Sequence, residues 1–293
     1  MSPQTEANQQ RQTATLDSLP HTEQEISSGT IRYRESGEGE PILFVHGLLV
    51  DSRLWEGAAG ILSQRHRCIL PDWPMGSHVT PMNPGTDLSP PSMAMVVAEF
   101  IESLGLDRVT VVGNDSGGAV SQMLVARRPE LVGRLVLTNC EFDENFPPFP
   151  FNAMPPLARL PGGTRALVEP FRLGPVRRGV YGMLAKRPIP DRLLSSWIEP
   201  AATNPRIRED VRSFVSGVRK QDLVEATARL ADFERPALMA WAPEDRFMGI
   251  EDAEKAAAAM PDARVERIAD AKTFVSLDQP QRLAHLIDAF VSA

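Results

Sequence analysis

The sequence is poor in cysteine. Its two cysteines, Cys68 and Cys140, lie far apart in the chain. We expect both to be buried thiols, because neither the cysteines nor the histidines have the spacing of a disulfide framework or a metal site. The sequence therefore predicts no bound metal. A chain of 293 residues with 42% hydrophobic content can bury a large core without crosslinks.

Basic residues and long apolar runs are also scarce. The net charge of −7 argues against nucleic acid or an anionic membrane surface as the main partner. No apolar run is long enough to span a membrane. The first 24 residues are polar and have neither a basic start nor an apolar centre. We therefore expect a disordered tail at residues 1–24 and a cytoplasmic protein, with no indication of its oligomeric state.

Short apolar segments alternate with helical patterns along most of the chain. This alternation predicts an α/β fold with a mostly parallel, doubly wound sheet. A weakly alternating segment at 25–34, with a turn at 36–40, fits an edge hairpin strand. The other expected strands are 41–45, 67–70, 109–112, 134–139, 237–242 and 264–268. The expected helices are 51–62, 89–104, 119–128, 251–260 and 281–292.

Composition changes after Glu141. Prolines crowd the segment 146–205, and the pattern of strands does not resume until Pro236. Such a stretch is too long for a simple loop, so it predicts an inserted unit of short helices. We expect a helical cap at 145–225 over a core formed by 25–144 and 226–293.

Residues 108–118 read RVTVVGNDSGG, a buried strand followed by a glycine-rich turn and a helix. A sharp strand-to-helix turn requires small residues two positions before and two positions after its central residue. Gly113 and Gly117 meet this requirement around Asp115. Centring the turn on Ser116 places Asn114 at a small position, so Ser116 is the less favoured nucleophile. An ordinary glycine-rich turn remains the alternative interpretation.

Three further features complete a family resemblance. A His46–Gly47 step follows an early strand, a helical insertion follows the sheet's central strands, and the residues WAPED at 241–245 follow a late strand. Together with GNDSG they resemble the α/β-hydrolase superfamily from about Glu25 onward. The aspartate at the turn resembles the branch of haloalkane dehalogenases and epoxide hydrolases, in which a carboxylate attacks carbon.

The resemblance implies roles for individual residues. Asp115 takes the position of the nucleophile and Asp245 that of the acid, and no cofactor is implied. The backbone N–H groups of Leu48 and Ser116 resemble the two donors of the oxyanion hole. His46 is expected to orient its loop.

The chain departs from the family at the general base. The position of the catalytic histidine holds Thr273, and no histidine lies between His78 and His285. His285 falls in the middle of the last helix, where we expect a packed or surface residue. Ser116 and Leu48 replace the indole and the amide with which dehalogenases hold a halide. Tyr181 is the only tyrosine of the insertion, whereas epoxide hydrolases usually use two. The loss of a positioned base costs roughly 10²- to 10⁴-fold in rate.

Candidates for a substitute base lie elsewhere in the chain. His78 follows an expected strand at the edge where ligands bind in such sheets, and its alternative role is a solvated loop histidine. Glu141 and Asp143 follow the strand after the turn and are either pocket acids or solvated loop acids. Paired carboxyl groups in a dry cleft can exchange protons without histidine. Lys272 can instead pair with Asp245.

We expect a pocket for an apolar small molecule between sheet and cap. The residues predicted to line it are His46, Trp73, Asn114, Phe146, Phe149, Tyr181, Phe247 and Thr273. The first functional hypothesis is a small-molecule hydrolase with Asp115 as nucleophile and a non-standard or absent base. The second is a cofactor-free lyase, isomerase or cyclase in which Asp115 transfers a proton. The third is an inactive binding homologue.

Overall fold

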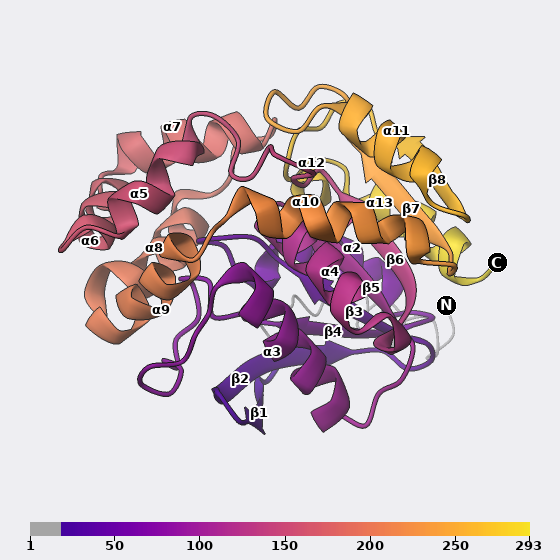
Figure 1. Cartoon of the computed structure of the whole chain (residues 1–293), viewed down its shortest axis with the longest axis horizontal. Coiled ribbons are helices and arrows are strands. Elements are labelled where there is room, and N and C mark those ends of the chain that lie inside the picture. The colour runs from indigo at the N-terminus through magenta and orange to yellow at the C-terminus, as the bar shows by residue number, and fades with distance from the viewer. Residues whose placement is uncertain (1–18) are drawn as a thin grey trace, which may run out of the picture.

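A computed structural model describes residues 19–293 of the chain, and these residues form an eight-stranded sheet between two layers of helices (Figure 1). The strands are β1 (Thr22–Ile26), β2 (Gly29–Ser36), β3 (Pro41–Val45), β4 (Arg67–Pro71), β5 (Val109–Asn114), β6 (Val132–Thr138), β7 (Ala237–Trp241) and β8 (Ala263–Arg267). Their order in the sheet is β1-β2-β4-β3-β5-β6-β7-β8. The pairs β1–β2 and β2–β4 are antiparallel and the remaining pairs are parallel. The predicted α/β fold is confirmed.

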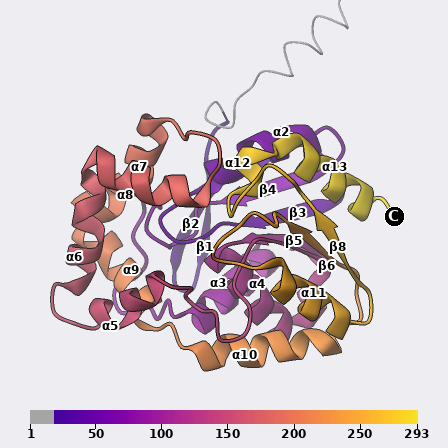
Figure 2. The ribbon, with the colours of Figure 1, turned by 90° about the horizontal axis from the view of Figure 1, so that it is seen from above.

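The central strand is β5, which lies between β3 and β6 and is buried along its whole length. Helices cover both of its faces, which explains why its sequence is a continuous run of small and apolar residues rather than an alternating pattern. The helices of the core are α2 (Glu56–Leu62), α3 (Pro90–Ser103), α4 (Ser116–Arg127), α10 (Lys220–Arg229), α11 (Ile250–Ala259), α12 (Val275–Asp278) and α13 (Pro280–Val291). In Figure 2, α2 and α13 lie on one face of the sheet, whereas α3, α4, α10 and α11 lie on the other.

The N-terminal hairpin differs from its prediction. The segment expected as one strand at 25–34 is divided between β1 and β2, and the tight turn at 27–28 joins them instead of a turn at 36–40. Because β1 pairs with β2 from Thr22 onward, the polar tail predicted for residues 1–24 does not extend through its last three positions. Residues 1–18 of that tail lie outside the described residues.

The inserted region carries short helices over the carboxyl edge of the parallel strands (Figure 1). They are α5 (Met154–Ala158), α6 (Gly163–Val168), α7 (Gly174–Leu184), α8 (Asp191–Thr203) and α9 (Pro205–Ser216). The cap boundary predicted at residue 225 falls inside α10, which packs against α4 of the core. Leu223 and Ala226 are buried in this contact, and the hydroxyl of Thr227 donates a 2.9 Å hydrogen bond to Gln122 on α4. The core therefore resumes near Lys220.

Cys68 and Cys140 are both buried free thiols, as expected. Within residues 19–293, no helix combines the length and the apolar character needed to cross a bilayer. In the same part of the chain, no group of three or more His, Cys, Asp or Glu side chains is arranged to hold a metal ion.

Candidate active site

Asp115 occupies the apex of the turn between β5 and α4. Its backbone has φ 53° and ψ −143°, a conformation that residues other than glycine rarely adopt. A Cβ atom at Gly117 would lie 2.3 Å from the backbone oxygen of His46, and one at Gly113 would lie 2.6 Å from Ser121 Oγ. The predicted requirement for small residues on both sides of Asp115 is therefore confirmed. It arises because strand and helix nearly touch at this turn.

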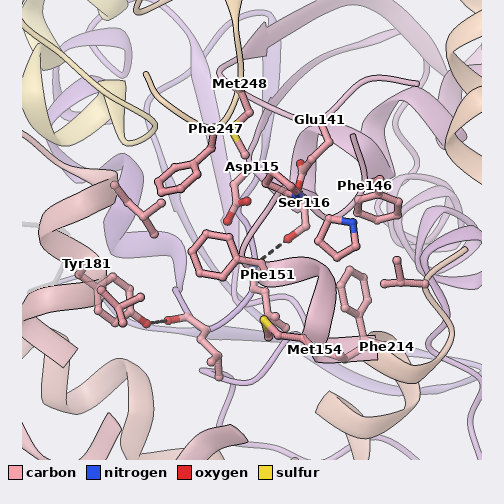
Figure 3. Close-up of a pocket in the computed structure, with 18 of the residues that line it drawn as sticks. Asp115, Ser116, Glu141, Phe146, Phe151, Met154, Tyr181, Phe214, Phe247 and Met248 are labelled. Atoms are coloured by element: carbon pink, nitrogen blue, oxygen red, sulfur yellow. Dashed lines mark hydrogen bonds between the residues drawn. The ribbon is translucent and has the colours of Figure 1, made fainter. Parts of the chain in front are cut away.

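Asp115 lines a cavity of about 790 Å³, including its opening to solvent, between the sheet and the cap. Aromatic and aliphatic side chains form most of its wall, and Figure 3 shows several of them around the Asp115 carboxyl group. Of the residues singled out from the sequence, the cavity is lined by Leu48, Asp115, Ser116, Glu141, Phe146, Tyr181 and Phe247. Sequence reasoning did not place Met154 on α5, Phe171 before α7 or Phe214 on α9 in this wall. Which side of a short cap helix faces the core is decided by packing.

Two carboxyl groups of this wall are held in an apolar environment. Burial raises the pKa of Asp115 to about 7; the backbone N–H of Ser116 opposes this rise, and the charge of Asp245 adds to it. Burial also raises the pKa of Glu141 well above its usual range, and the charge of Asp115 adds to this effect. Glu141 is 3% exposed, and its Oε2 has no hydrogen-bond partner in the described structure. Burial therefore favours the neutral form of both carboxyl groups, and Asp115 changes its charge near neutral pH.

One of the two expected oxyanion donors is occupied. The N–H of Leu48 donates a 2.9 Å hydrogen bond to Ser116 Oγ, the side chain that follows Asp115 (Figure 3). The prediction that Leu48 supplies a free donor is therefore wrong for this structure. An anion enters such a site only where free hydrogen-bond donors replace the water molecules that it loses. This corner of the cavity consequently offers an anion less stabilisation than the family resemblance implied.

The position expected for the base is closed to the cavity. Thr273 is 0% exposed and does not line the cavity, and its backbone oxygen accepts a 2.7 Å hydrogen bond from the Asn114 side chain. Asp245 accepts hydrogen bonds from Asn139 Nδ2 at 3.0 Å and from the N–H of Phe247 at 2.8 Å. Burial raises the pKa of Asp245, although these donors and the Thr273 hydroxyl oppose the rise. The acid position is thus filled and hydrogen-bonded without an imidazole beside it.

Among the residues that the structure describes, no histidine lines the cavity. The prediction of His78 as a substitute base is wrong, because its ring is bound on both sides. Its Nδ1 accepts a 3.2 Å hydrogen bond from the N–H of Gly76, and its Nε2 lies 2.9 Å from Asp210 on α9. His78 therefore joins the loop after β4 to the cap. His285 is exposed on α13, where the sequence placed it.

Five other predicted lining residues do not reach the cavity. His46 is buried and accepts a 2.8 Å hydrogen bond from the N–H of Trp73, in agreement with its expected role in orienting the loop. The indole of Trp73 donates to the backbone oxygen of Phe44 inside the core. Asn114 is buried outside the cavity, where its side chain donates to the backbone oxygen of Thr273. Phe149 is 79% exposed on the cap surface. These placements are corrections, because sequence cannot tell a core aromatic from a pocket aromatic.

The loop that carries Thr273 is tied to the cap. Lys272 Nζ donates to the backbone oxygen of Gly182 at 3.0 Å and so does not pair with Asp245 as suggested. The N–H of Phe274 donates to the backbone oxygen of Leu184 at 2.9 Å. The exposed side chain of Lys255 holds Asp143, the other proposed pocket acid, outside the cavity at 2.8 Å. Of the two acids that follow β6, Glu141 is therefore the one that lines the cavity together with Asp115.

Comparison with known proteins agrees with this architecture. A family model described as "alpha/beta hydrolase fold" matches residues 40–280, so the chain belongs to the α/β-hydrolase fold family. It is 28% identical to "Haloalkane dehalogenase 2" of Mycobacterium tuberculosis, over 89% of this chain and 91% of that protein. It is 26% identical to a "2-hydroxy-6-oxo-6-phenylhexa-2,4-dienoate hydrolase" of Comamonas testosteroni, over 83% of this chain and 85% of that protein.

Solved structures show the same fold. An ancestral haloalkane dehalogenase superimposes with a TM-score of 0.77 at 23% identity, covering 94% of this chain and 98% of the other. The epoxide hydrolase CorEH, without ligand, superimposes with a TM-score of 0.77 at 20% identity, covering 94% of this chain and 99% of the other. The chain is therefore an α/β-hydrolase fold protein with haloalkane dehalogenase-like relatives.

Proposed function

We propose that this protein is a hydrolase of apolar small molecules in which Asp115 attacks an sp³ carbon. The supporting observation is the position of Asp115 at the strained apex between β5 and α4, with its side chain at a largely apolar cavity. The names of its dehalogenase and epoxide hydrolase relatives agree with this choice of electrophile. A carboxylate in a dry site is a stronger nucleophile than one in water, because fewer water molecules must leave it.

In the first step, one carboxylate oxygen of Asp115 forms a bond to the substrate carbon. The leaving group departs with its bonding electron pair, and Asp115 becomes a neutral ester. With the pKa of Asp115 raised to about 7, this step requires the ionised half of the population near neutral pH.

Glu141 can serve as the base of the second step. The charge of Asp115 is one of the causes that keep the pKa of Glu141 high. Ester formation removes that charge while burial, the larger cause, remains, so the pKa of Glu141 falls and more of the group loses its proton to solvent. The resulting carboxylate takes a proton from a water molecule as this water attacks the ester carbonyl carbon. The alcohol then leaves, and Asp115 returns as a carboxylate.

A second candidate function is supported by the hydrogen bond between Leu48 and Ser116. Because the Leu48 N–H is occupied, the site offers limited stabilisation to the oxyanion that ester hydrolysis requires. Two carboxyl groups with raised pKa values, however, suit proton transfer to or from an apolar substrate. In this alternative the protein is a lyase, isomerase or cyclase, and no ester forms.

Intact mass spectrometry distinguishes these functions. The protein is incubated with a panel of haloalkanes and epoxides, and the wild type is compared with Asp115→Asn and Glu141→Gln. We expect a mass increase equal to the alkyl group in the wild type and its absence in Asp115→Asn. Glu141→Gln should accumulate the adduct, because the second step loses its base. If no electrophile gives an adduct, the proton-transfer enzyme or the inactive binding homologue replaces the hydrolase.

A further inference from the structure

The cavity combines acidic groups with no basic side chain. Asp115 and Glu141 line it, and no lysine, arginine or histidine of the described residues does. Glu141 is 3% exposed, and its Oε2 has no hydrogen-bond partner. Figure 3 shows both carboxyl groups among the side chains that line the cavity. Buried polar atoms in proteins normally have a partner, so the unpaired oxygen of Glu141 indicates a donor that arrives with a ligand.

An anionic ligand does not fit this corner. The N–H of Leu48 already donates to Ser116 Oγ, and no side chain with a fixed positive charge faces the cavity. A carboxylate or halide placed beside Asp115 and Glu141 would lose its water without meeting a basic side chain of the described residues. A ligand with a positively charged donor group would instead stabilise the ionised form of both carboxyl groups, because an opposite charge nearby lowers their pKa.

The walls of the cavity also suit a cation. The aromatic residues Phe146, Phe151, Phe214, Phe247 and Tyr181 all line it, and Figure 3 shows the rings of Phe151 and Phe247 on the same side as the Asp115 carboxyl group. The face of an aromatic ring attracts a cation within about 6 Å of its centre. The hydroxyl of Tyr181 is held away from the cavity, because it donates to the backbone oxygen of Leu49 at 2.5 Å. Its ring therefore contributes an aromatic surface rather than a competing donor.

A second apolar cavity of about 680 Å³, including its opening to solvent, lies beside the first one beneath the cap. The two share Leu49, Phe151, Met154, Phe171 and Val180 as lining residues. The second cavity is otherwise lined by apolar residues, among them Leu157 on α5, and contains no charged residue. A ligand whose polar end lies at Asp115 can therefore extend an apolar body under the cap.

We propose that the ligand of this cavity is an amphiphilic amine, with its ammonium group between Asp115 and Glu141 and its apolar chain beneath the cap. This inference deepens the proposed hydrolysis, since it names the substrate class of the same cavity. It concerns reversible binding, however, and requires no covalent step. A substrate would carry the ammonium group and its leaving group on one apolar skeleton.

Isothermal titration calorimetry at pH 8 tests the proposal with n-hexylamine, n-octylamine and the neutral alcohols of the same lengths. None of these probes carries a leaving group, so binding is measured without the chemical step. We expect each amine to bind at least tenfold more tightly than its alcohol. Lengthening the amine should raise affinity roughly fourfold per methylene, as burial of a CH₂ group predicts.

Variants locate the two ends of the amine. Glu141→Gln keeps the shape of the side chain but not its charge, and it should reduce amine affinity at least tenfold while leaving alcohol affinity unchanged. Glu144→Gln alters an exposed acid of the same loop and is the matched control. Leu157→Trp narrows the second cavity and should remove the advantage of octylamine over hexylamine. Circular dichroism and the melting temperature of each variant establish that it is folded.

Three results would overturn the proposal: equal affinity for amine and alcohol, unchanged amine affinity in folded Glu141→Gln, or tighter binding of hexanoate than of hexylamine. These results are independent of the adduct measurement. An alkyl adduct on Asp115 without a preference for amines contradicts the ligand assignment alone. A preference for amines without any adduct contradicts the proposed hydrolysis alone.

Discussion

The backbone N–H of Leu48 and the hydroxyl oxygen of Ser116 are joined by a 2.9 Å hydrogen bond beside Asp115. The Ser116 side chain thus accepts the hydrogen bond of the Leu48 N–H, which the family resemblance assigns to the substrate. Ser116 directly follows Asp115, and its hydroxyl proton remains available to a ligand. Because of this bond, the cavity presents one backbone donor fewer to an anion.

Replacing Ser116 by Ala tests this bond. The variant leaves the Leu48 N–H without its acceptor, which is expected to lower the free energy of unfolding by about 1 kcal/mol. Urea unfolding followed by circular dichroism measures the change. Sodium bromide should stabilise Ser116→Ala relative to an equal concentration of sodium fluoride, because bromide can accept a hydrogen bond from the freed Leu48 N–H. Ser103→Ala, at the exposed end of α3, is the control. A bromide response equal in the variant and the wild type would show that the freed N–H does not bind anions.

The raised pKa of Asp115 predicts how stability depends on pH. The unfolded chain releases the Asp115 proton near the ordinary value of 3.8, whereas the folded protein keeps it to about 7. Between these values the folded state binds more protons, so the free energy of unfolding falls as pH rises, by at most about 1.4 kcal/mol per pH unit from this group. Glu141, whose pKa is also raised, contributes with the same sign.

Asp115→Asn should flatten this dependence. Urea titrations from pH 4.5 to 7.5 should give a smaller loss of stability in the variant than in the wild type. Asp262→Asn, an exposed acid in the turn before β8, is the control and should follow the wild-type curve. Parallel curves for Asp115→Asn and the wild type would mean that Asp115 titrates near its ordinary pKa.

Thr273→His restores the residue that the family places opposite its nucleophile. The new imidazole would lie beside Asp245, whose pKa the Thr273 hydroxyl already lowers. We expect the decay of an alkyl adduct on Asp115 to accelerate by roughly 10²- to 10⁴-fold, the usual contribution of a positioned base. Intact mass measured over time gives the decay rate. The buried site must expand, so about 1–3 kcal/mol of stability should be lost.

Thr273→Phe is the matched control for this experiment. It overfills the same buried position but supplies no base, so its adduct should decay at the wild-type rate. Adding Asp245→Asn to Thr273→His should remove most of the gain, because the imidazole loses its partner. An unchanged decay rate in folded Thr273→His would show that this position does not face the ester.

The glycines of the chain predict a contrast in stability. Gly117→Ala places a Cβ atom 2.3 Å from the backbone oxygen of His46, and only a backbone shift can relieve this contact. We expect a loss of roughly 3 kcal/mol or more, or no soluble protein. Gly60→Ala, in α2, meets nothing within 4 Å and should gain about 0.5–1 kcal/mol from helix propensity. Thermal unfolding measures both. A melting temperature of Gly117→Ala equal to that of the wild type would contradict the close approach of strand and helix.

Features that depend on local patterns could be predicted from the order of the residues alone. The buried run of β5 and the glycines around Asp115 are read within eleven residues, because strand burial and a tight turn restrict the residues allowed at each position. The alternation of strands and helices likewise specified the α/β fold, since each crossover of a parallel sheet needs its own helix.

Which side chains meet at the cavity depends on contacts between distant parts of the folded chain. His78 was a plausible base until Asp210 on α9, 132 residues later, was found at its Nε2. Glu141 and Phe149 both follow β6, yet the first is 3% and the second 79% exposed. Their contrast depends on how the cap packs over the sheet, a contact between distant segments that no local period encodes. Periodicity specifies which face of an element is apolar, whereas the partner of that face is fixed only when the whole chain has folded.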